Sequence, residues 1–167
     1  GVQTCALPIS EPVDATPVDI FDAAARGDLA AIDRAILSEG IDVDLPHSES
    51  GATPLIVAAA ERAGVDVTTL LLDRGADPNA KKTNGDSALH WACYHGDWDV
   101  ASVLLNAGAD VNASGDLRNS PLHMAATGSH EVLCAELLAR GANADAKNEF
   151  QVVPSSTARG EIGRAHV

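Results

Sequence analysis

The sequence predicts an all-α solenoid in which helix-turn-helix units of about 33 residues stack side by side. Gly75, Gly108 and Gly141 recur 33 residues apart, each followed by Ala and then by Asp or Asn. Ser87 and Ser120 open two further matching segments at the same spacing, each with Leu-His two residues on. A fixed period of this length is typical of stacked supersecondary units. Each unit buries its apolar face only against its neighbours.

The first helix of each unit has a recognisable start. Thr53 and Ser120 are N-cap residues whose side chains can accept from the free N–H groups of the helix. Pro54 and Pro121 follow at the first helical position, where no N–H donor is needed. A pair of small residues, Ala-Ala or Ala-Cys, lies four residues further on and keeps the helix thin, so that neighbouring helices can approach closely.

The second helix of each unit carries a pair of leucines and ends at the recurring glycine. Glycine ends a helix in a left-handed turn that side chains resist. Asp or Asn follows and starts a projecting turn. The leucine pairs are Leu71-Leu72, Leu104-Leu105 and Leu137-Leu138.

The box Ser120-Pro121-Leu122-His123, with Ala125 two residues after it, resembles the ankyrin repeat, and so does the 33-residue period. The resemblance covers about residues 19–158. It implies an all-α ankyrin-repeat solenoid of helix-turn-helix units with projecting β-turn or hairpin loops. It also implies a protein-protein interaction module that is not an enzyme and needs no cofactor.

The predicted ankyrin repeat domain covers residues 19–160, preceded by a linker at 10–18 that contains Pro12 and Pro17. Its repeats are 19–44, 45–79, 80–112, 113–145 and a partial repeat at 146–160. The first lacks the Thr-Pro opening, as a capping repeat would. The expected helices are 20–26, 29–38, one that begins at Pro54, 65–74, 88–95, 98–106, 121–127 and 130–140.

Several positions depart from the repeat pattern. Repeats 1 and 2 are one residue longer between the small residue of the first helix and the closing glycine, so we expect a bulge or a lengthened helix end in each. Ile56 replaces the histidine of the box. Arg118 and Gln151 stand at loop-tip positions where glycine is usual, and we expect the turn at 114–119 to shift to Gly115.

We interpret residues 1–9 and 161–167 as adapter-derived and non-native. The codons available for residues 4–9 have a reverse complement that can encode the C-terminal peptide, and this DNA resembles a sequencing-library adapter. Such segments are excluded from arguments about the fold. Truncation of repeat 5 predicts that Leu133, Leu137 and Leu138 are exposed, that exchange protection falls toward the C-terminus and that the fragment associates. The intact protein is expected to be monomeric.

The composition restricts the classes of partner. The net charge of −13 disfavours nucleic acid, whose phosphates would be repelled, and favours a basic or neutral partner. No apolar run has the length of a membrane span, so no membrane partner is expected. Cys93 and Cys134 are predicted to be reduced core thiols of an intracellular, cytoplasmic protein.

Candidate catalytic and metal-binding residues have structural explanations. The resemblance implies that His90 and His123 hydrogen-bond within and between repeats. Cys93 takes the second small position of its box and is predicted to face inward, and no second Cys/His pair has zinc spacing. The remaining carboxylates are expected on solvated helix faces: Asp97, Asp99, Glu131 and Glu136.

The resemblance places the partner-binding residues on the projecting turns and on the exposed side of the first helices, along a concave face. Tyr94 is the favoured anchor because tyrosine offers contact area at low entropic cost. Leu117 and Phe150 are apolar residues at loop tips, although Phe150 could equally pack on the rest of repeat 5. The predicted contact residues are Glu49, Lys81, Thr83, Asn84, Asp86, Tyr94, His95, Asp116, Leu117, Asn119, Thr127 and Phe150.

Two other functions remain open at this point. The repeats could be a regulatory or substrate-docking segment of a larger enzyme or channel. They could also inhibit an enzyme by occluding its active site. A flanking catalytic or membrane domain would support the first alternative, and loss of one enzyme's activity on binding would support the second.

Overall fold

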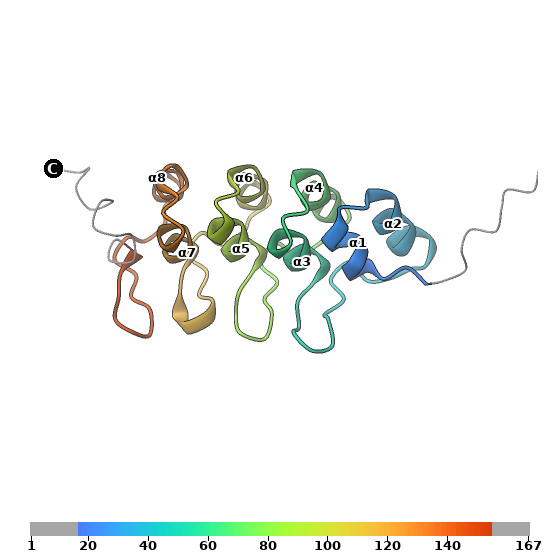
Figure 1. Cartoon of the computed structure of the whole chain (residues 1–167), viewed down its shortest axis with the longest axis horizontal. Helices are drawn as coiled ribbons and strands as arrows, with labels where there is room; N and C mark the ends of the chain where they lie inside the picture. The colour runs from blue at the N-terminus through green and yellow to red at the C-terminus, as the bar shows by residue number, and fades with distance from the viewer. Residues whose placement is uncertain (1–16, 155–167) are drawn as a thin grey trace, which may run out of the picture.

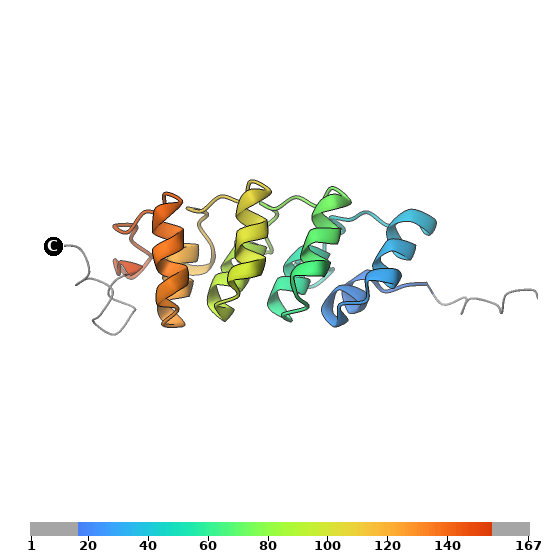
Figure 2. The ribbon, with the colours of Figure 1, turned by 90° about the horizontal axis from the view of Figure 1, so that it is seen from above.

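The computed structural model describes residues 17–154, in which the helices form two parallel rows (Figures 1 and 2). The first helix of each repeat lies between the second-helix row and the loop tips, which project to one side (Figure 1). Within the described range, none of the helices has the length and apolarity that a membrane span requires. The first-helix row is α1 (Ile20–Arg26), α3 (Pro54–Ala60), α5 (Ala88–His95) and α7 (Pro121–Thr127). The second-helix row is α2 (Leu29–Asp33), which continues as the π-helical turn η1 (Arg34–Ser38), then α4 (Val65–Asp73), α6 (Trp98–Asn106) and α8 (Glu131–Ala139).

The predicted helices are confirmed to within a residue or two at each end. The bounds of α1, α5, α6 and α7 coincide with those expected from the sequence. Gly75, Gly108 and Gly141 adopt φ angles of 93°, 95° and 91°, the left-handed conformation predicted for the ends of the second helices. The predicted linker and terminal segments lie outside the described residues, apart from residues 17 and 18.

The extra residue of repeat 1 forms the bulge that the sequence predicts, whereas the expectation for repeat 2 is wrong. In repeat 1 the second helix widens into the π-helical turn η1, which absorbs one residue without breaking the helix. In repeat 2 the helix α4 is nine residues long, the same length as α6. The additional residue lengthens the turn before α4 instead, where Arg62 and Gly64 have φ angles of 58° and 101°.

One of the two predicted N-caps is present and the other is not. Ser120 Oγ accepts from the backbone N–H of His123. Thr53 makes no capping hydrogen bond, and its hydroxyl is buried without a hydrogen-bond partner. The two sites differ at the third helical residue, which is His123 in one and Ile56 in the other. Since Ser120 Oγ also lies 2.8 Å from His123 Nδ1, the histidine holds the serine in place, and Ile56 cannot do this for Thr53.

The turn at 114–119 does not shift to Gly115, which has a φ of −102°. A short 3-10 helix, η2 (Asp116–Arg118), forms instead, and Leu117 and Arg118 adopt φ angles of 51° and 59°. Gln151 keeps the left-handed conformation at 60°. The surrounding hydrogen bonds therefore hold the loop shape at a cost of about 1 kcal/mol or more for each such side chain.

The core runs continuously between the two helix rows and is built from alanines, from one leucine in each of α3, α5 and α7, and from one or two isoleucines, valines or leucines of each second helix. Leu133 and Leu137, one helical turn apart in α8, are buried in this cluster. The expectation that they are exposed is therefore wrong, because they face the first helix of their own repeat. Leu138 and Val132 point away and are exposed.

A ladder of side-chain hydrogen bonds connects the ends of successive second helices. Asn79 Oδ1 accepts from the backbone N–H of Asp110, and Asn79 Nδ2 donates to Gly108 O. Asn112 repeats both contacts one unit later, toward Asn143 and Gly141. The recurring Asn thus fixes the spacing between repeats as well as starting the turn.

Candidate functional site

Two buried histidines connect the first helices to the loop tips that follow them. His90 Nδ1 accepts from the backbone N–H of Ser87 at 3.1 Å. That contact assigns the proton to Nε2, which donates to Ala113 O and Asn119 O at 3.2 and 3.1 Å. His123 makes the corresponding bonds, with its Nε2 3.0 Å from the carbonyl of Val152 in the next tip. These rings are structural links, as the sequence predicted.

Burial lowers the pKa of His90, and the nearby Asp86 only partly offsets this effect. A protonated ring would also place a hydrogen on Nδ1, opposite the backbone N–H of Ser87. His90 is therefore a neutral histidine held by three fixed partners, with no free nitrogen to transfer a proton.

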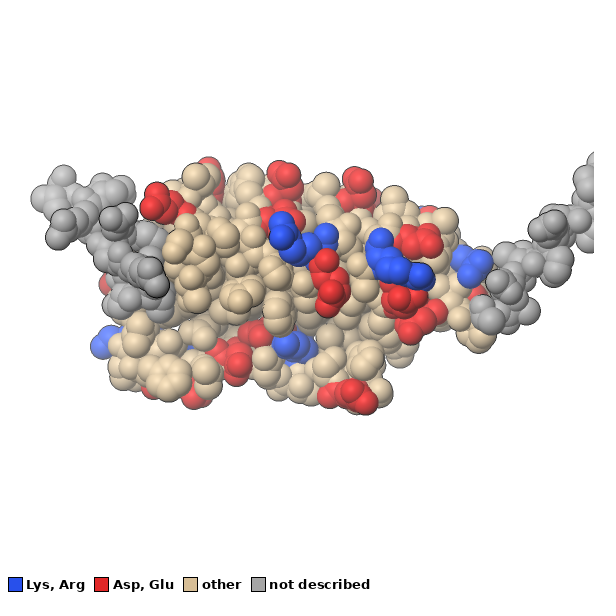
Figure 3. Space-filling model, in the orientation of Figure 1, with Lys and Arg blue, Asp and Glu red and all other residues tan. Residues whose placement is uncertain are grey.

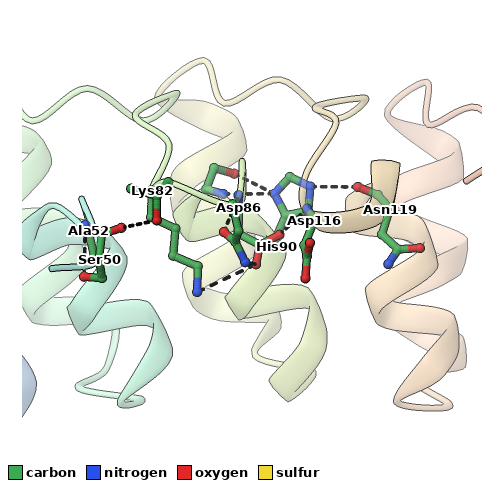
Figure 4. A network of polar contacts seen from close by, with 10 residues as sticks. Ser50, Ala52, Lys82, Asp86, His90, Asp116 and Asn119 are labelled. Atoms are coloured by element: carbon green, nitrogen blue, oxygen red, sulfur yellow. Dashed lines mark hydrogen bonds and ion pairs between the residues drawn. The ribbon is translucent and has the colours of Figure 1, made fainter. Parts of the chain in front are cut away.

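Asp86, a predicted contact residue, lies inside a polar network and is only 3% exposed (Figure 4). Its Oδ1 accepts from the backbone N–H of Asp116 at 2.8 Å, which connects the tips of repeats 3 and 4. Its Oδ2 accepts from Asn84 Nδ2 at 2.9 Å and lies 3.9 Å from Lys82 Nζ. Asp86 therefore holds the neighbouring side chains and the tip of repeat 4 in position.

Three other predicted contact residues also join neighbouring tips. Their hydrogen bonds to those tips use some of the donors and acceptors that a partner could otherwise meet. Lys81 Nζ donates to Ser114 O at 3.0 Å, and Thr83 Oγ1 donates to Ser50 O at 2.9 Å. Asn119 is half-buried, and its Oδ1 accepts from Asn148 Nδ2. The tips therefore form one connected row.

An aromatic cluster marks the end of α5. The ring of Tyr94 contacts Trp91 and His95 edge to face, at centroid distances of 6.2 and 5.3 Å. His95 is itself fixed, with Nε2 2.9 Å from Ala60 O of the preceding repeat. Tyr94 remains 45% exposed. The predicted anchor is thus an accessible ring packed against two aromatic neighbours, whereas the predicted contact His95 is a bridge between repeats.

Thr127, the predicted contact residue that follows the box of repeat 4, lies at the end of α7 and is exposed. Its hydroxyl donates to the backbone carbonyl of His123 one turn earlier in the same helix.

A hollow of about 270 Å³ lies between α5, α7 and the tips of repeats 3 and 4. Three of its lining residues, Trp91, Met124 and Lys82, are not among the contacts predicted from the sequence. Trp91 and Met124 occupy the variable position directly after the box histidine. Comparing that position between repeats would have found them, because both residues are larger than the neighbouring alanines. The lining residues are Lys82, Asn84, Asp86, Trp91, Tyr94, Asp116, Asn119 and Met124.

The remaining predicted contacts lie exposed at the loop tips, as the sequence suggests. Leu117 and Phe150 are 42% and 67% exposed, and the backbone N–H of Glu149 donates to Leu117 O, so their tips are neighbours. Glu49 and Asp116 are exposed acidic residues. On the face shown in Figure 3, acidic side chains lie both along the helices and on the tips, with smaller basic groups among them.

The two cysteines of the described range are free and buried. Desolvation raises the pKa of both thiols, so neither is a ready nucleophile. Asp99, Glu131 and Glu136 are exposed, and Asp97 caps α6 by accepting from the N–H of Val100. Among residues 17–154, His, Cys, Asp and Glu side chains form no group of three that could hold a metal ion.

Comparison with known proteins agrees with this architecture. The chain is 38% identical over 81 residues to a protein named probable E3 ubiquitin-protein ligase XBOS33, from Oryza sativa subsp. japonica, which is 47% of this chain and 15% of the relative. It is 41% identical over 61 residues to the B-cell lymphoma 3 protein homolog of Mus musculus, 36% of this chain and 13% of that protein. The chain thus spans less than a fifth of either relative. The family model described as ankyrin repeats (3 copies) matches residues 20–115 and 59–148. Its period, box and two-row fold therefore have one explanation: the chain belongs to the ankyrin-repeat family.

Proposed function

We propose that this chain binds a partner protein through its inner face, which we define as the loop tips together with the exposed ends of α5 and α7. Ankyrin repeats generally mediate protein-protein interaction and are non-catalytic. The observation that carries the proposal for this chain is the exposed ring of Tyr94, which lines the hollow, together with the exposed side chains of Leu117 and Phe150 on the neighbouring tips of repeats 4 and 5. Tyrosine is among the residues enriched in binding hot spots.

The inner face is ordered before any partner arrives. Each of its tips is connected to the next, through Ser50–Thr83, Asp86–Asp116 and Asn119–Asn148. Little conformational entropy is then lost on binding, which favours affinity. The proposed contacts are Tyr94, Leu117, Phe150, Asp116, Asn84, Thr127 and Glu49, with Lys81, Thr83 and His95 at the margins.

Selection from a library of displayed random peptides tests this proposal with the purified chain. We expect enriched peptides that bind Tyr94→Ala at least tenfold more weakly than the unaltered protein, because a central aromatic anchor contributes about 2 kcal/mol or more. Isothermal titration calorimetry measures the affinities. Val132→Ala is the matched control, since Val132 is an exposed apolar residue of α8 in the other helix row.

Two results would count against the inner face. One is the absence of any peptide enriched over an empty support. The other is a set of selected peptides whose binding depends on Val132 and not on Tyr94.

A second candidate is a docking or regulatory segment of a larger enzyme, and the name of the rice relative favours it. In that arrangement the inner face would hold a substrate or a regulatory partner of the attached enzyme. Sequencing the natural gene outward from residues 19 and 158 tests the idea. A continuous reading frame into a catalytic domain would support it, whereas a stop codon soon after a capping repeat would favour a free-standing adaptor.

An intracellular location stays part of this proposal. The two buried, free cysteines favour a reducing compartment, although they do not select one. Expression of a tagged full-length gene with fluorescence imaging would test it.

A further inference from the structure

The hollow beside Tyr94 has its own chemical preference, which goes beyond binding to an unspecified partner. Its volume of about 270 Å³ is below the roughly 300–1,000 Å³ of small-molecule sites, and it suits one side chain of a partner. One lysine and two aspartates line it, so the local net charge is −1. We propose that this hollow receives a basic side chain, arginine or lysine, of a bound peptide segment. This rests on the proposed function above.

The protein's own Lys82 shows that the hollow stabilises a cation. Its ammonium nitrogen lies 4.5 Å from the centroid of Trp91, a cation-π contact, and 3.9 Å from Asp86 Oδ2. Asp86 thereby balances Lys82, and the face of Trp91 is already covered. The two charges on this side of the hollow are therefore paired with each other, while Trp91 Nε1 is buried without a hydrogen-bond partner.

The side formed by Tyr94 and Asp116 has no such balance. The carboxylate of Asp116 is exposed and makes no ion pair with any residue of the described range, while its backbone N–H is fixed on Asp86. Tyr94 offers an accessible ring beside it. A guanidinium or ammonium group between these two would meet a carboxylate and an aromatic face, the same pair of groups that holds Lys82.

The amides at the rim suit the same ligand. Asn84 and Asn119 line the hollow and can hydrogen-bond to the stem or backbone of an incoming peptide. Met124 forms an apolar, half-buried part of the lining against which the methylene groups of a basic side chain can pack. The net charge of −13 attracts a basic segment over longer distances.

Peptides selected on the unaltered chain provide the probe, and calorimetry measures their affinity. We expect the enriched peptides to share a basic residue whose replacement by glutamine weakens binding. We expect Asp116→Asn to weaken it about fivefold, the upper range for an exposed ion pair. Asp99→Asn, which changes the net charge equally on the exposed face of α6, should leave it unchanged. Lys82→Gln should strengthen binding, because it removes a competing cation.

The result that would overturn the inference differs from the one that would overturn the proposed function. If peptides bind through Tyr94 but need no basic residue, and Asp116→Asn behaves like Asp99→Asn, the inner face binds a partner and the basic-residue inference is wrong. Weaker binding to Lys82→Gln with acidic peptides selected would show that the hollow takes an anionic group. If no peptide depends on Tyr94, both proposals are wrong. Replacing the basic residue of a bound peptide by glutamine leaves the protein unaltered, so it tests the inference independently of any folding defect in a variant.

Discussion

Two junctions between repeats differ in how a first helix contacts the loop tip of the next repeat. One lies between repeats 2 and 3, and the other lies between repeats 3 and 4. In the later junction His90 donates to two carbonyls of the next tip, Ala113 O and Asn119 O. In the earlier one Ile56 occupies the same place in the box as a buried apolar residue. The third residue of a first helix can thus hydrogen-bond to the next loop tip or be a buried apolar residue, in which case the hydrogen bonds between the tips of repeats 2 and 3 come from Thr83 to Ser50 O.

The two solutions impose different requirements on their neighbours. At the later junction Gly115 lies so close to the ring that an added Cβ would come within 2.7 Å of His90 Nε2. At the earlier junction the corresponding residue, 33 positions back, is Lys82. In return, Thr53 Oγ1 is left without a partner because Ile56 offers it none. The polar junction requires a small residue, and the apolar junction carries an unsatisfied hydroxyl.

The largest effect is expected at Gly115. Gly115→Ala should reduce the free energy of unfolding by about 2–3 kcal/mol, since the new methyl group meets His90 Nε2 and Asp86 Oδ1 and overpacks the junction. Urea denaturation followed by circular dichroism measures the loss. The control is Gly108→Ala, which should cost only about 1 kcal/mol, because Gly108 has a φ of 95° but no atom within 4 Å of an added Cβ. A smaller loss at Gly115 than at Gly108 would contradict the close approach.

Removing the polar link should cost somewhat less. His90→Ile converts the later junction into the form of the earlier one and should reduce stability by about 2 kcal/mol, because Ala113 O loses its donor in a buried setting. Ile56→Val, which trims only one methylene from the apolar junction, should cost about 1 kcal/mol. Equal losses in urea denaturation would show that the hydrogen bonds of His90 add nothing beyond burial.

The unsatisfied hydroxyl predicts a smaller effect with the opposite sign. Thr53→Val should leave stability unchanged or raise it by about 0.5–1 kcal/mol, because it removes a buried group that has no partner. Ser120→Ala should lower stability by about 1 kcal/mol through loss of the cap and of the contact with His123.

A double variant separates this explanation from simple differences in side-chain size. In the Ile56→His background the imidazole can accept from Thr53, so there Thr53→Val should become destabilising. Thermal denaturation of the four variants would reveal this change of sign, and its absence would mean that Ile56 is not the cause of the unsatisfied hydroxyl.

The smallest effect concerns pH. The pKa of His90 in the folded protein lies below the ordinary value of 6.5, so between these two values the unfolded chain binds more protons than the folded one. Stability should therefore fall as the pH drops from about 6.5 toward the folded pKa. The His90→Ile variant should lack this part of the loss. Urea midpoints at pH 7.5 and 5.5 test it, and identical pH dependence in both proteins would contradict it.

The sequence by itself determined most of the architecture of this protein. The proline and serine at the start of α7 and the glycine after each second helix act within a few residues, so the local physics of caps and left-handed turns sets those boundaries. The 33-residue period determined that the units stack, since no single unit can bury its own apolar face. The packing of Tyr94 against Trp91 and His95 was not evident in the sequence, but its role as an exposed anchor was proposed from it.

Only the tertiary structure decided which loop residues face outward and which hold the loops together. Asp86 and Asp116 look alike in the sequence, both being acidic residues at loop tips, yet one is buried in the network and the other is exposed. The difference arises because Asp86 meets a backbone N–H of the next repeat, 30 residues away in the chain. Contacts between repeats are made by residues far apart in sequence, and they depend on the spacing and rotation of the stacked units, which no local pattern encodes.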